Sequence, residues 1–321
     1  MRRQLVQIIP EWIKKPVRAW RERKIIDEIR QLPVKGSGVE GELPYVELDT
    51  GMVFYGTPPT DMQRYYFRYL KDDLPELSED CMNVVWEIVD RYLVPRSVPG
   101  ETIYNPVLTK LLRDPLNDFT YSFERRKELA AMFRPQNGEV CIDIGAYHGY
   151  GTMRLAQLVG DEGKVIAFEA DSDSAAILSK NIEANRFRNI RVINHAVSDH
   201  KGKETIYRLG TTANSLNHDV LSNVCDAMPH TEEIDVNTVD NILGGQGIHH
   251  CNHVSITING AEPEALVGMR DLLTRSTNVR ISIAGWYPRE DAKVADFVIP
   301  HLEEMGFKVI RGDLGRVLAW K

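Results

Sequence analysis

The sequence predicts an α/β protein built on a doubly wound, mostly parallel sheet with a late antiparallel hairpin. Three observations predict it. Residues 139–169 read as strand, glycine turn, helix and strand. Strand and helix patterns then alternate along the following 140 or so residues, as in doubly wound sheets. Two short apolar runs near 307–310 and 317–320 close the chain at hairpin spacing.

The βαβ unit at 139–169 has the features of a nucleotide-type site. Its first apolar run is Val140–Ile144, and its second, Val165–Phe168, is followed directly by Glu169. Turn-forming glycines follow the first run: Gly145, Gly149 and Gly151. Glycine lets the backbone bend tightly and lets a ligand approach without a Cβ in the way. An acid at the end of the second strand can accept hydrogen bonds from two ribose hydroxyls.

The glycine spacing argues against a dinucleotide, and a nearby acid favours a cationic ligand. It is Gly-x-x-x-Gly-x-Gly, which differs from the dinucleotide pattern G-x-G-x-x-G. Asp143 stands two residues before the first glycine, where a carboxylate would repel a pyrophosphate. It suits the sulfonium and amino groups of S-adenosylmethionine (SAM). A dinucleotide fold with unusual glycines and a βαβ unit without a ligand are the alternatives.

Length and composition suggest three parts: a basic segment at 1–32, a mostly helical region at 33–134, and the sheet domain at 135–321. The 43% hydrophobic and 26% charged content is ordinary for a soluble globular protein. Four scattered cysteines without C-x-x-C predict a reduced, cytoplasmic protein. The net charge of −7 gives no reason to expect nucleic acid as a partner.

Residues 1–24 depart from the acidic average. They hold eight bases and two acids, and apolar residues recur near helical spacing from Leu5 to Trp20. A basic amphipathic segment with tryptophans can lie on an anionic membrane surface, so peripheral membrane contact is one expectation. Pro10 and Pro16 interrupt the segment, and a helix packed on its own domain is the alternative.

The region before the sheet is predicted to be mostly helical. Residues 33–60 are rich in glycine and proline and predict a loop, with a short strand at Met52–Tyr55. Helical patterns follow over 61–70, 79–93 and 101–134.

After Glu169, the next helix runs to about Asn185, and a strand is expected at 190–196. Ser198 and Asp199 would then lie where the end of that strand meets the ligand crevice. A weakly alternating segment at 204–209, an irregular polar stretch at 211–229 and an edge strand at 234–236 follow.

The stretch His249–His253 contains three histidines and a cysteine, but its spacing does not let the side chains converge on a metal, so we predict no metal site. A strand at 254–258 then leads to a helix that begins near Pro263, and a strand at 279–283 precedes Trp286 and Tyr287.

An ordered set of short motifs resembles the FkbM family of SAM-dependent methyltransferases. The set runs through Asp143-Ile144-Gly145-Ala146 with Gly149, Ala167-Phe168-Glu169, Asn181 and Asn185, Ala196-Val197-Ser198-Asp199, Gly202, Val236-Asn237-Thr238-Val239-Asp240 and Gly260-Ala261-Glu262. The resemblance implies a seven-stranded class I (Rossmann-like) fold, SAM as cofactor, and O-methylation of sugars or related small molecules.

The chain departs from the family pattern at two places. The turn carries Tyr147 where the family usually has Asn. The fourth strand usually ends Ile-Asp-Val-Glu-Gly-Ala-Glu, and here Thr257 and Asn259 replace two acids. Neither side chain can deprotonate a hydroxyl or hold a cation well.

The resemblance and the residues together give a candidate site. We expect the cofactor to contact Asp143, Gly145, Tyr147, Gly149, Glu169, Ala170, Ser198 and Asp199. The acceptor would meet Thr257, Asn259, Trp286 and Tyr287. Glu262 and His148 are the candidate bases, with Asp199 a weaker one. The leading interpretation is an O-methyltransferase acting on a glycan or small hydroxyl compound. The alternatives are a SAM-binding protein without efficient turnover, a membrane-surface accessory protein of glycan synthesis and an NAD-linked oxidoreductase.

Overall fold

The computed structural model describes residues 29–59, 64, 77–92, 128–129, 131–208, 214–216, 230–312 and 315–321. The basic segment at 1–24 lies outside the described residues. So do nearly all of the helical pattern at 61–70, the pattern at 101–134 up to residue 127, and most of the polar stretch at 211–229.

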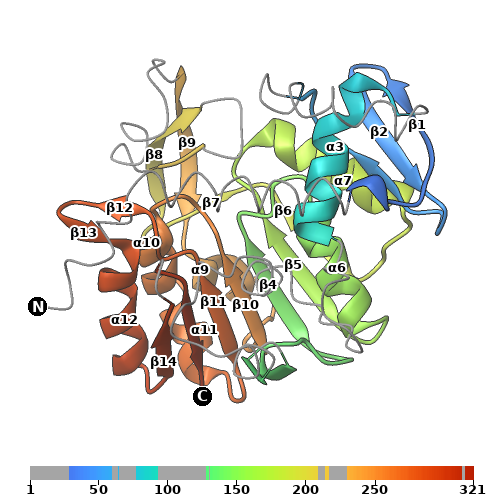
Figure 1. The fold of residues 1–321 in the computed structure, drawn as a ribbon. Coiled ribbons are helices and arrows are strands. Elements are labelled where there is room, and N and C mark those ends of the chain that lie inside the picture. Colours follow the sequence, from blue (N-terminus) through green and yellow to red (C-terminus); the bar gives the residue numbers. More distant parts are fainter. Residues whose placement is uncertain are drawn as a thin grey trace, which may run out of the picture.

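A seven-stranded sheet forms the centre of the protein (Figure 1). Its order is β14-β15-β11-β10-β4-β5-β6. The strands are β4 (Val140–Ile144), β5 (Lys164–Phe168), β6 (Ile190–Ile193), β10 (His253–Ile256), β11 (Arg280–Ile283), β14 (Lys308–Arg311) and β15 (Val317–Trp320). Only β15 runs against its neighbours within this sheet. The doubly wound, mostly parallel sheet with a late hairpin is confirmed, and it is the class I arrangement.

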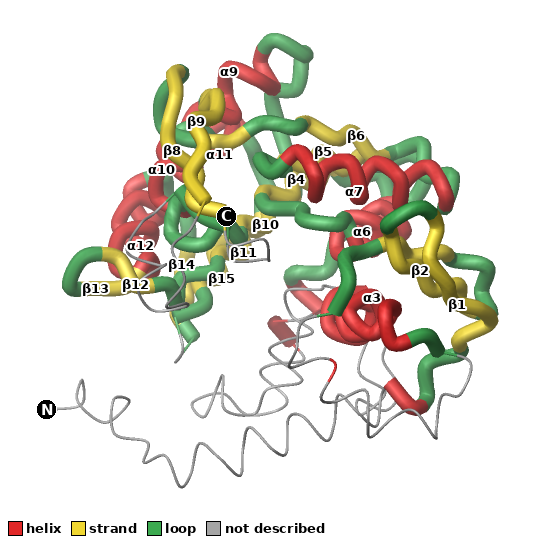
Figure 2. Tube along the Cα trace, turned by 90° about the horizontal axis from the view of Figure 1, so that it is seen from above, coloured by secondary structure: helices red, strands yellow, loops and turns green. Residues whose placement is uncertain are grey.

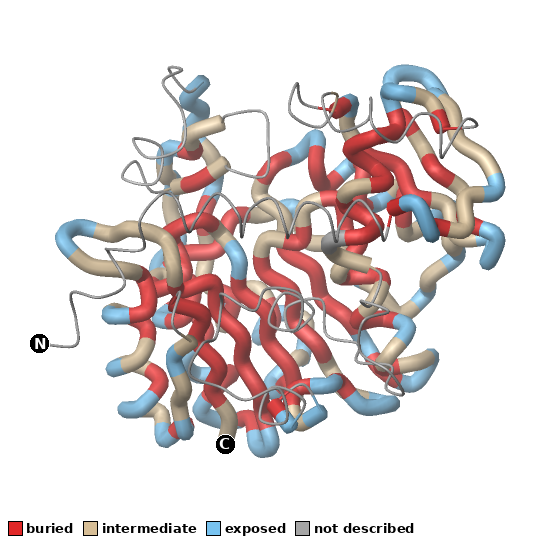
Figure 3. Tube along the Cα trace, viewed as in Figure 1, coloured by how far each residue is buried: buried red, intermediate tan, exposed pale blue. Residues whose placement is uncertain are grey.

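Helices cover both faces of the sheet. Two lie on one face, α6 (Tyr150–Val159) and α7 (Ser172–Ala184). The other face packs against α9 (Val239–Gly244), α10 (Glu262–Val267), α11 (Arg270–Arg275) and α12 (Val294–Glu304). Alternate strand residues supply the two cores: Ile142 and Ile144 face the second layer, and Cys141 faces α6. The central strands are accordingly buried along their length (Figure 3).

The region before the sheet begins with strands, so our prediction of a loop there is wrong. A three-stranded antiparallel sheet consists of β1 (Val34–Glu40), β2 (Leu43–Leu48) and β3 (Val53–Tyr55). Only β3 was expected. The strands form because β2 alternates, burying Val46 and Leu48 against the following helix, α3 (Met82–Glu87). The predicted helix at 79–93 is confirmed as η2 (Glu79–Cys81), α3 and one π-helical segment, η3 (Ile88–Tyr92).

Asn181 in α7 and Asn185 at its C-cap fasten this small sheet to the main domain. Asn181, fully buried, accepts a hydrogen bond from the backbone N–H of Tyr55 and donates to the carbonyl oxygens of Tyr55 and His148. Asn185 accepts from the backbone N–H of Val53 and donates to its carbonyl. The amides thus pair with β3 in place of a neighbouring strand, so the N-terminal sheet is held beside the start of α6.

A second small sheet stands at the carboxyl edge of the main one, where β8 and β9 project from the body (Figures 1 and 2). Its order is β7-β9-β8, with β7 at Ala196–Val197, β8 at Gly202–Arg208 and β9 at His230–Asn237. Residues 234–236, which we expected to form an edge strand, lie within a longer β9, and β9 is the central strand of this sheet. A two-stranded hairpin, β12 (Pro288–Arg289) and β13 (Ala292–Lys293), follows β11.

Cys81, Cys141 and Cys251 are buried and free, and Cys225 lies outside the described residues. Within the described ranges, no three His, Cys, Asp or Glu side chains are grouped so as to hold a metal ion. None of the described helices has the length and apolar character needed to cross a membrane.

Candidate functional site

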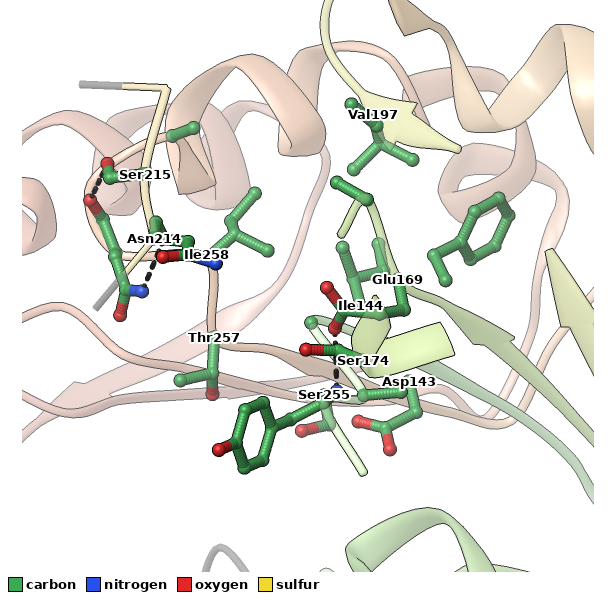
Figure 4. Close-up of a pocket in the computed structure, with 18 of the residues that line it drawn as sticks. Asp143, Ile144, Glu169, Ser174, Val197, Asn214, Ser215, Ser255, Thr257 and Ile258 are labelled. Atoms are coloured by element: carbon green, nitrogen blue, oxygen red, sulfur yellow. Dashed lines mark hydrogen bonds between the residues drawn. The ribbon is translucent and has the colours of Figure 1, made fainter. Parts of the chain in front are cut away.

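A cavity of about 280 Å³ opens at the carboxyl ends of β4, β5, β10 and β11. It brings together nine of the residues that the sequence predicted for the site. On the cofactor side these are Asp143, Gly145, Tyr147, Glu169 and Ala170, and on the acceptor side Thr257, Asn259, Trp286 and Tyr287. Figure 4 shows Asp143, Ser255 and Thr257 at the ends of the two neighbouring strands β4 and β10, with their side chains on the same side.

The glycine turn after β4 is shaped by its backbone. Gly145 adopts a φ of +84°, and its N–H and that of Ala146 both donate to the carbonyl oxygen of Phe168. A Cβ on Gly145 would lie 2.0 Å from the carbonyl oxygen of Thr257, so the ends of β4 and β10 touch here. Gly149 lies outside the cavity. Its φ is +82°, and a Cβ there would meet Leu178 of α7, so this glycine serves packing.

Glu169 lies at the end of β5, where the sequence predicted it. One carboxylate oxygen accepts the N–H of Tyr147 at 2.6 Å, and the other accepts the N–H of Asp171 at 3.0 Å. Burial raises the pKa of Glu169 to about 7, although both N–H donors act in the opposite direction. The first bond also supports Tyr147, whose φ of +53° is a costly conformation for a bulky side chain. The Asn that the family usually carries there adopts it more readily.

Asp143 is buried beneath the turn. It accepts a hydrogen bond from the Thr152 hydroxyl at 2.7 Å and another from Ser255 on the neighbouring strand. Burial raises the pKa of Asp143, and the positive charge of Arg91 acts against this rise. Arg91 comes from η3, lines the cavity and lies over the Tyr147 ring, with its guanidinium carbon 5.1 Å from the ring centroid.

The residues present fit SAM. A carboxylate offers about four acceptor positions, and the backbone occupies two on Glu169, so capacity is left for ribose hydroxyls. Asp143 is an acid that lines the same cavity, and a carboxylate there suits the amino group of SAM. Both carboxyls are buried at a cost, which a ligand rich in hydroxyls and positive charge would offset.

The residues that we expected to meet the acceptor are polar and aromatic. Asn259 has a φ of +56°, and its amide donates to the carbonyl oxygen of Asn214 at 2.7 Å. The Ser215 hydroxyl donates to the Asn259 carbonyl at 2.6 Å. Asn259 therefore fastens residues 214–215 to the end of β10, and these two residues also line the cavity. We expected Thr257 and Asn259 to share one strand face, but β10 ends at Ile256 and both follow it.

Neither expected base borders the cavity. Glu262 is fully buried, and its two oxygens accept the N–H groups of Ile258 and Gly260 at 3.0 and 2.8 Å. It closes the turn before α10, and burial raises its pKa to about 7. His148 is stacked on Tyr147, with the ring centroids 3.6 Å apart, and burial lowers its pKa to about 3. We therefore propose neither as the base.

Ser198 and Asp199 also lie away from the cavity. The chain turns after β7, where the Ser198 hydroxyl donates to Glu204 and Asp199 pairs with His200 at the surface. His195, Ala196 and Val197 line the cavity instead, since they come directly after β6. We expected this strand to continue to residue 196, but β6 ends at Ile193. The chain therefore reaches the cavity at residues 195–197 and not at Ser198 and Asp199.

Sequence reasoning missed several lining residues. Ser255 could have been found, since it precedes Thr257 by two residues in a strand that we expected to continue to residue 258. Arg91 and Arg316 carry no local signal. His253 lines the cavity with neither ring nitrogen hydrogen-bonded, and burial lowers its pKa to about 3.

Comparison with known proteins agrees with this geometry. Residues 143–309 match the Methyltransferase FkbM domain, which is more than half of the chain. The chain therefore belongs to the FkbM family of SAM-dependent methyltransferases, and its cofactor is SAM. A stretch of 57 residues is 37% identical to a probable cobalt-precorrin-6B C(15)-methyltransferase (decarboxylating) from Sulfurisphaera tokodaii. This stretch is 18% of the chain and spans 30% of that relative's length.

Solved structures show more distant likenesses. A putative O-methyltransferase from Klebsiella pneumoniae is 17% identical, with 74% of this chain and 98% of that one covered and a TM-score of 0.37. Fibrillarin from Aeropyrum pernix with bound SAM is 10% identical over 90% and 99% of the two chains, also at 0.37. These likenesses do not bear on the acceptor.

Proposed function

We propose that this protein transfers a methyl group from SAM to a hydroxyl oxygen of a sugar, a glycan or a related small molecule. The observation that carries this proposal is a cavity whose lining combines two kinds of group. It includes the acids Asp143 and Glu169 at the ends of β4 and β5, and Thr257, Trp286 and Tyr287 from the segments that follow β10 and β11. Aromatic side chains suit the face of a sugar ring, and hydroxyl and amide groups suit its hydroxyls.

SAM, held by Glu169 and Asp143, would supply a sulfonium methyl carbon to the acceptor oxygen; S-adenosylhomocysteine would leave with the electron pair of the carbon–sulfur bond, and the hydroxyl proton would be released to bulk solvent. The protein's own contribution is alignment and exclusion of water, which can lower a barrier by roughly 7–11 kcal/mol. Thr257 and Asn259 offer hydrogen bonds for this alignment but no negative charge.

The proposal is tested by a tritiated-methyl assay on a panel of sugars and hydroxyl metabolites, with and without EDTA. We expect label in the product of at least one acceptor and no loss of rate with EDTA, because Thr257 and Asn259 supply no carboxylate for a cation. Tight SAM binding without transfer to any acceptor would instead favour a binding protein without efficient turnover. A requirement for added divalent metal would contradict our assignment of these two residues.

We also propose that the basic segment at 1–24 contacts an anionic membrane surface on the cytoplasmic side, bringing the enzyme to its acceptor. Its excess of bases and its apolar stripe support this proposal. Deletion of residues 1–24 should reduce co-sedimentation with phosphatidylserine vesicles at least several-fold and leave the affinity for SAM unchanged. Equal co-sedimentation of both proteins would favour a helix packed on its own domain.

A further inference from the structure

His253 is the first residue of β10, and it lines the cavity from a fully buried position. Neither of its ring nitrogens has a hydrogen-bond partner in the described part of the chain. A buried polar group without a partner is destabilising, because it has lost its bonds to water and gained none in return. Since His253 borders a cavity, a ligand that enters this cavity can supply the missing partner.

The cavity follows β10 along its whole length. Its lining begins at His253, continues with Ser255 on the same face of the strand, and reaches Thr257 beyond the strand's end. His253 pairs in register with Cys141, which packs on Leu155 of α6, and Leu155 also lines the cavity. The cavity therefore extends from the carboxyl edge of the sheet down between the sheet and α6. We call this extension, bordered by His253, Ser255 and Leu155, the deep arm.

The groups next to His253 on this face of the sheet are polar. Ser255 pairs in register with Asp143 on β4 and with Ser282 on β11, so these three residues form a row across neighbouring strands. Asp143 accepts a hydrogen bond from the Ser255 hydroxyl. The hydroxyl of Ser282, which is 1% exposed, has no partner among the described residues. A buried polar row of this kind suits a polar ligand group and disfavours an apolar one.

The ring of His253 is neutral at physiological pH. Burial lowers its pKa to about 3, and the positive charge of Arg280, which pairs with it in register on β11, acts in the same direction. The guanidinium of Arg280 is itself occupied by Glu139 and by backbone carbonyl oxygens. A neutral imidazole presents one N–H donor and one acceptor nitrogen. His253 thus offers the deep arm a hydrogen-bond donor that carries no charge of its own.

The order of the strands indicates which part of SAM faces the deep arm. β4 lies between β5 and β10 in the sheet. We expect the ribose at Glu169, directly after β5, so a SAM molecule that crosses the end of β4 carries its amino-acid end toward β10. That end has an ammonium group, which suits Asp143, and a carboxylate, which needs N–H or O–H donors.

We propose that His253 binds the carboxylate of the amino-acid end of SAM through its ring N–H, while Asp143 binds the ammonium group. This inference rests on the proposed function only in its use of SAM, and it holds whichever acceptor is methylated. Arg91, which also lines the cavity, is already paired with Glu87 and is not needed for this contact. The N–H of His253 and the nearby charge of Arg280 both favour a carboxylate in the deep arm.

The test is calorimetry on the full chain with S-adenosylhomocysteine (SAH), decarboxylated SAH and 5′-methylthioadenosine. Decarboxylated SAH lacks only the carboxylate, and 5′-methylthioadenosine lacks the whole amino-acid end. We expect the wild type to bind SAH at least about tenfold more tightly than decarboxylated SAH, as for a hydrogen bond to a charged group. His253→Phe should reduce this preference to about twofold or less and leave the affinity for 5′-methylthioadenosine unchanged.

Two further variants identify the nitrogen that donates. His253→Asn and His253→Gln carry an amide N–H near the positions of Nδ1 and Nε2 respectively, so one of them should restore part of the preference. The free His253→Phe protein should melt no lower than the wild type, because it has lost two unpartnered buried nitrogens. His253→Leu takes its place if the larger ring does not fold. The control is His301→Phe, in α12 outside the cavity, where Nδ1 is likewise unpartnered among the described residues.

Equal binding of SAH and decarboxylated SAH by the wild type would overturn this assignment of His253. So would a preference that persists undiminished in folded His253→Phe or His253→Leu, restoration by neither amide, or weaker binding of all three probes with a lower melting temperature, which indicates a structural role. Absence of SAH binding by the wild type would instead contradict the proposed function at its cofactor. An intact carboxylate preference without methyl transfer to any hydroxyl acceptor would contradict the proposed function alone.

Discussion

Replacing Glu169 with glutamine should lower the affinity for SAH by at least about tenfold, since lost charge-assisted hydrogen bonds cost roughly 1.5–3 kcal/mol. The carboxylate has acceptor capacity beyond the N–H groups of Tyr147 and Asp171, and a ribose diol would use it. Its burial also means that the variant loses stability, because glutamine can accept only one of those two backbone bonds well. Calorimetry with SAH measures the affinity.

The same variant should change the dependence of binding on pH. The pKa of Glu169 is about 7 in the folded protein, above its ordinary value of 4.5, through burial and through the nearby charges of Asp171 and Asp143. The stability contributed by its protonated form is therefore present below about 4.5 and is lost as pH rises through 7. The ribose hydroxyls of SAH would donate to the ionised carboxylate of Glu169, so the wild-type affinity for SAH should rise between pH 6 and pH 8. Glu169→Gln should bind SAH without this rise.

Glu262→Gln is the matched control for this pH effect. Its carboxylate also has a pKa of about 7 and also accepts two backbone N–H groups, but it lies outside the cavity. We expect this variant to lose stability and to keep the rise in SAH affinity with pH. A flat profile in the wild type, or a rise in Glu169→Gln as large as in the wild type together with unchanged SAH affinity, would contradict contact between Glu169 and the ligand.

The sequence predicted the glycine turn and the position of Glu169 at the end of β5 because these signals are local. Glycines, a strand and an acid within 139–169 determine the turn and the position of Glu169 without help from distant residues. Residues 34–48 were missed for the opposite reason. Their glycines and prolines suggest a loop, and the strands form through antiparallel pairing and through packing of Val46 and Leu48 on α3. Burial against a distant helix outweighs local propensity there.

The surroundings of the two expected bases, and the presence of Arg316 in the cavity lining, could not be read from spacing. Tyr147, directly before His148, has a positive φ, and so does Asn259, three residues before Glu262. A positive φ changes the direction of the chain after each of these two residues. The side chains of His148 and Glu262 consequently point into the protein instead of the cavity. Arg316 depends on the register of β15 against β11, a pairing between residues more than thirty positions apart. No pattern within one segment carries this information.

Gly145→Ala is expected to be among the most damaging single substitutions in the domain. A left-handed φ costs a non-glycine residue roughly 1–2 kcal/mol, and overpacking costs about 1–3 kcal/mol more. The overpacking cost applies fully here, because the new Cβ would lie 2.0 Å from the backbone oxygen of Thr257. A backbone oxygen cannot rotate away as a side chain can. Relief requires the ends of β4 and β10 to separate, and these ends carry Asp143 and Ser255.

Gly138→Ala separates the two costs of the Gly145 substitution. Gly138 has nearly the same φ, +82° against +84°, but a Cβ there meets no atom within 4 Å. It should lower the free energy of unfolding by about 1–2 kcal/mol and leave SAH affinity intact. Gly145→Ala should lose more stability in denaturant unfolding and should bind SAH weakly even where it is folded, because the acids and the turn no longer keep their spacing. Equal losses of stability in the two variants, with SAH affinity retained in both, would show that contact between the ends of β4 and β10 is not what requires glycine at this position.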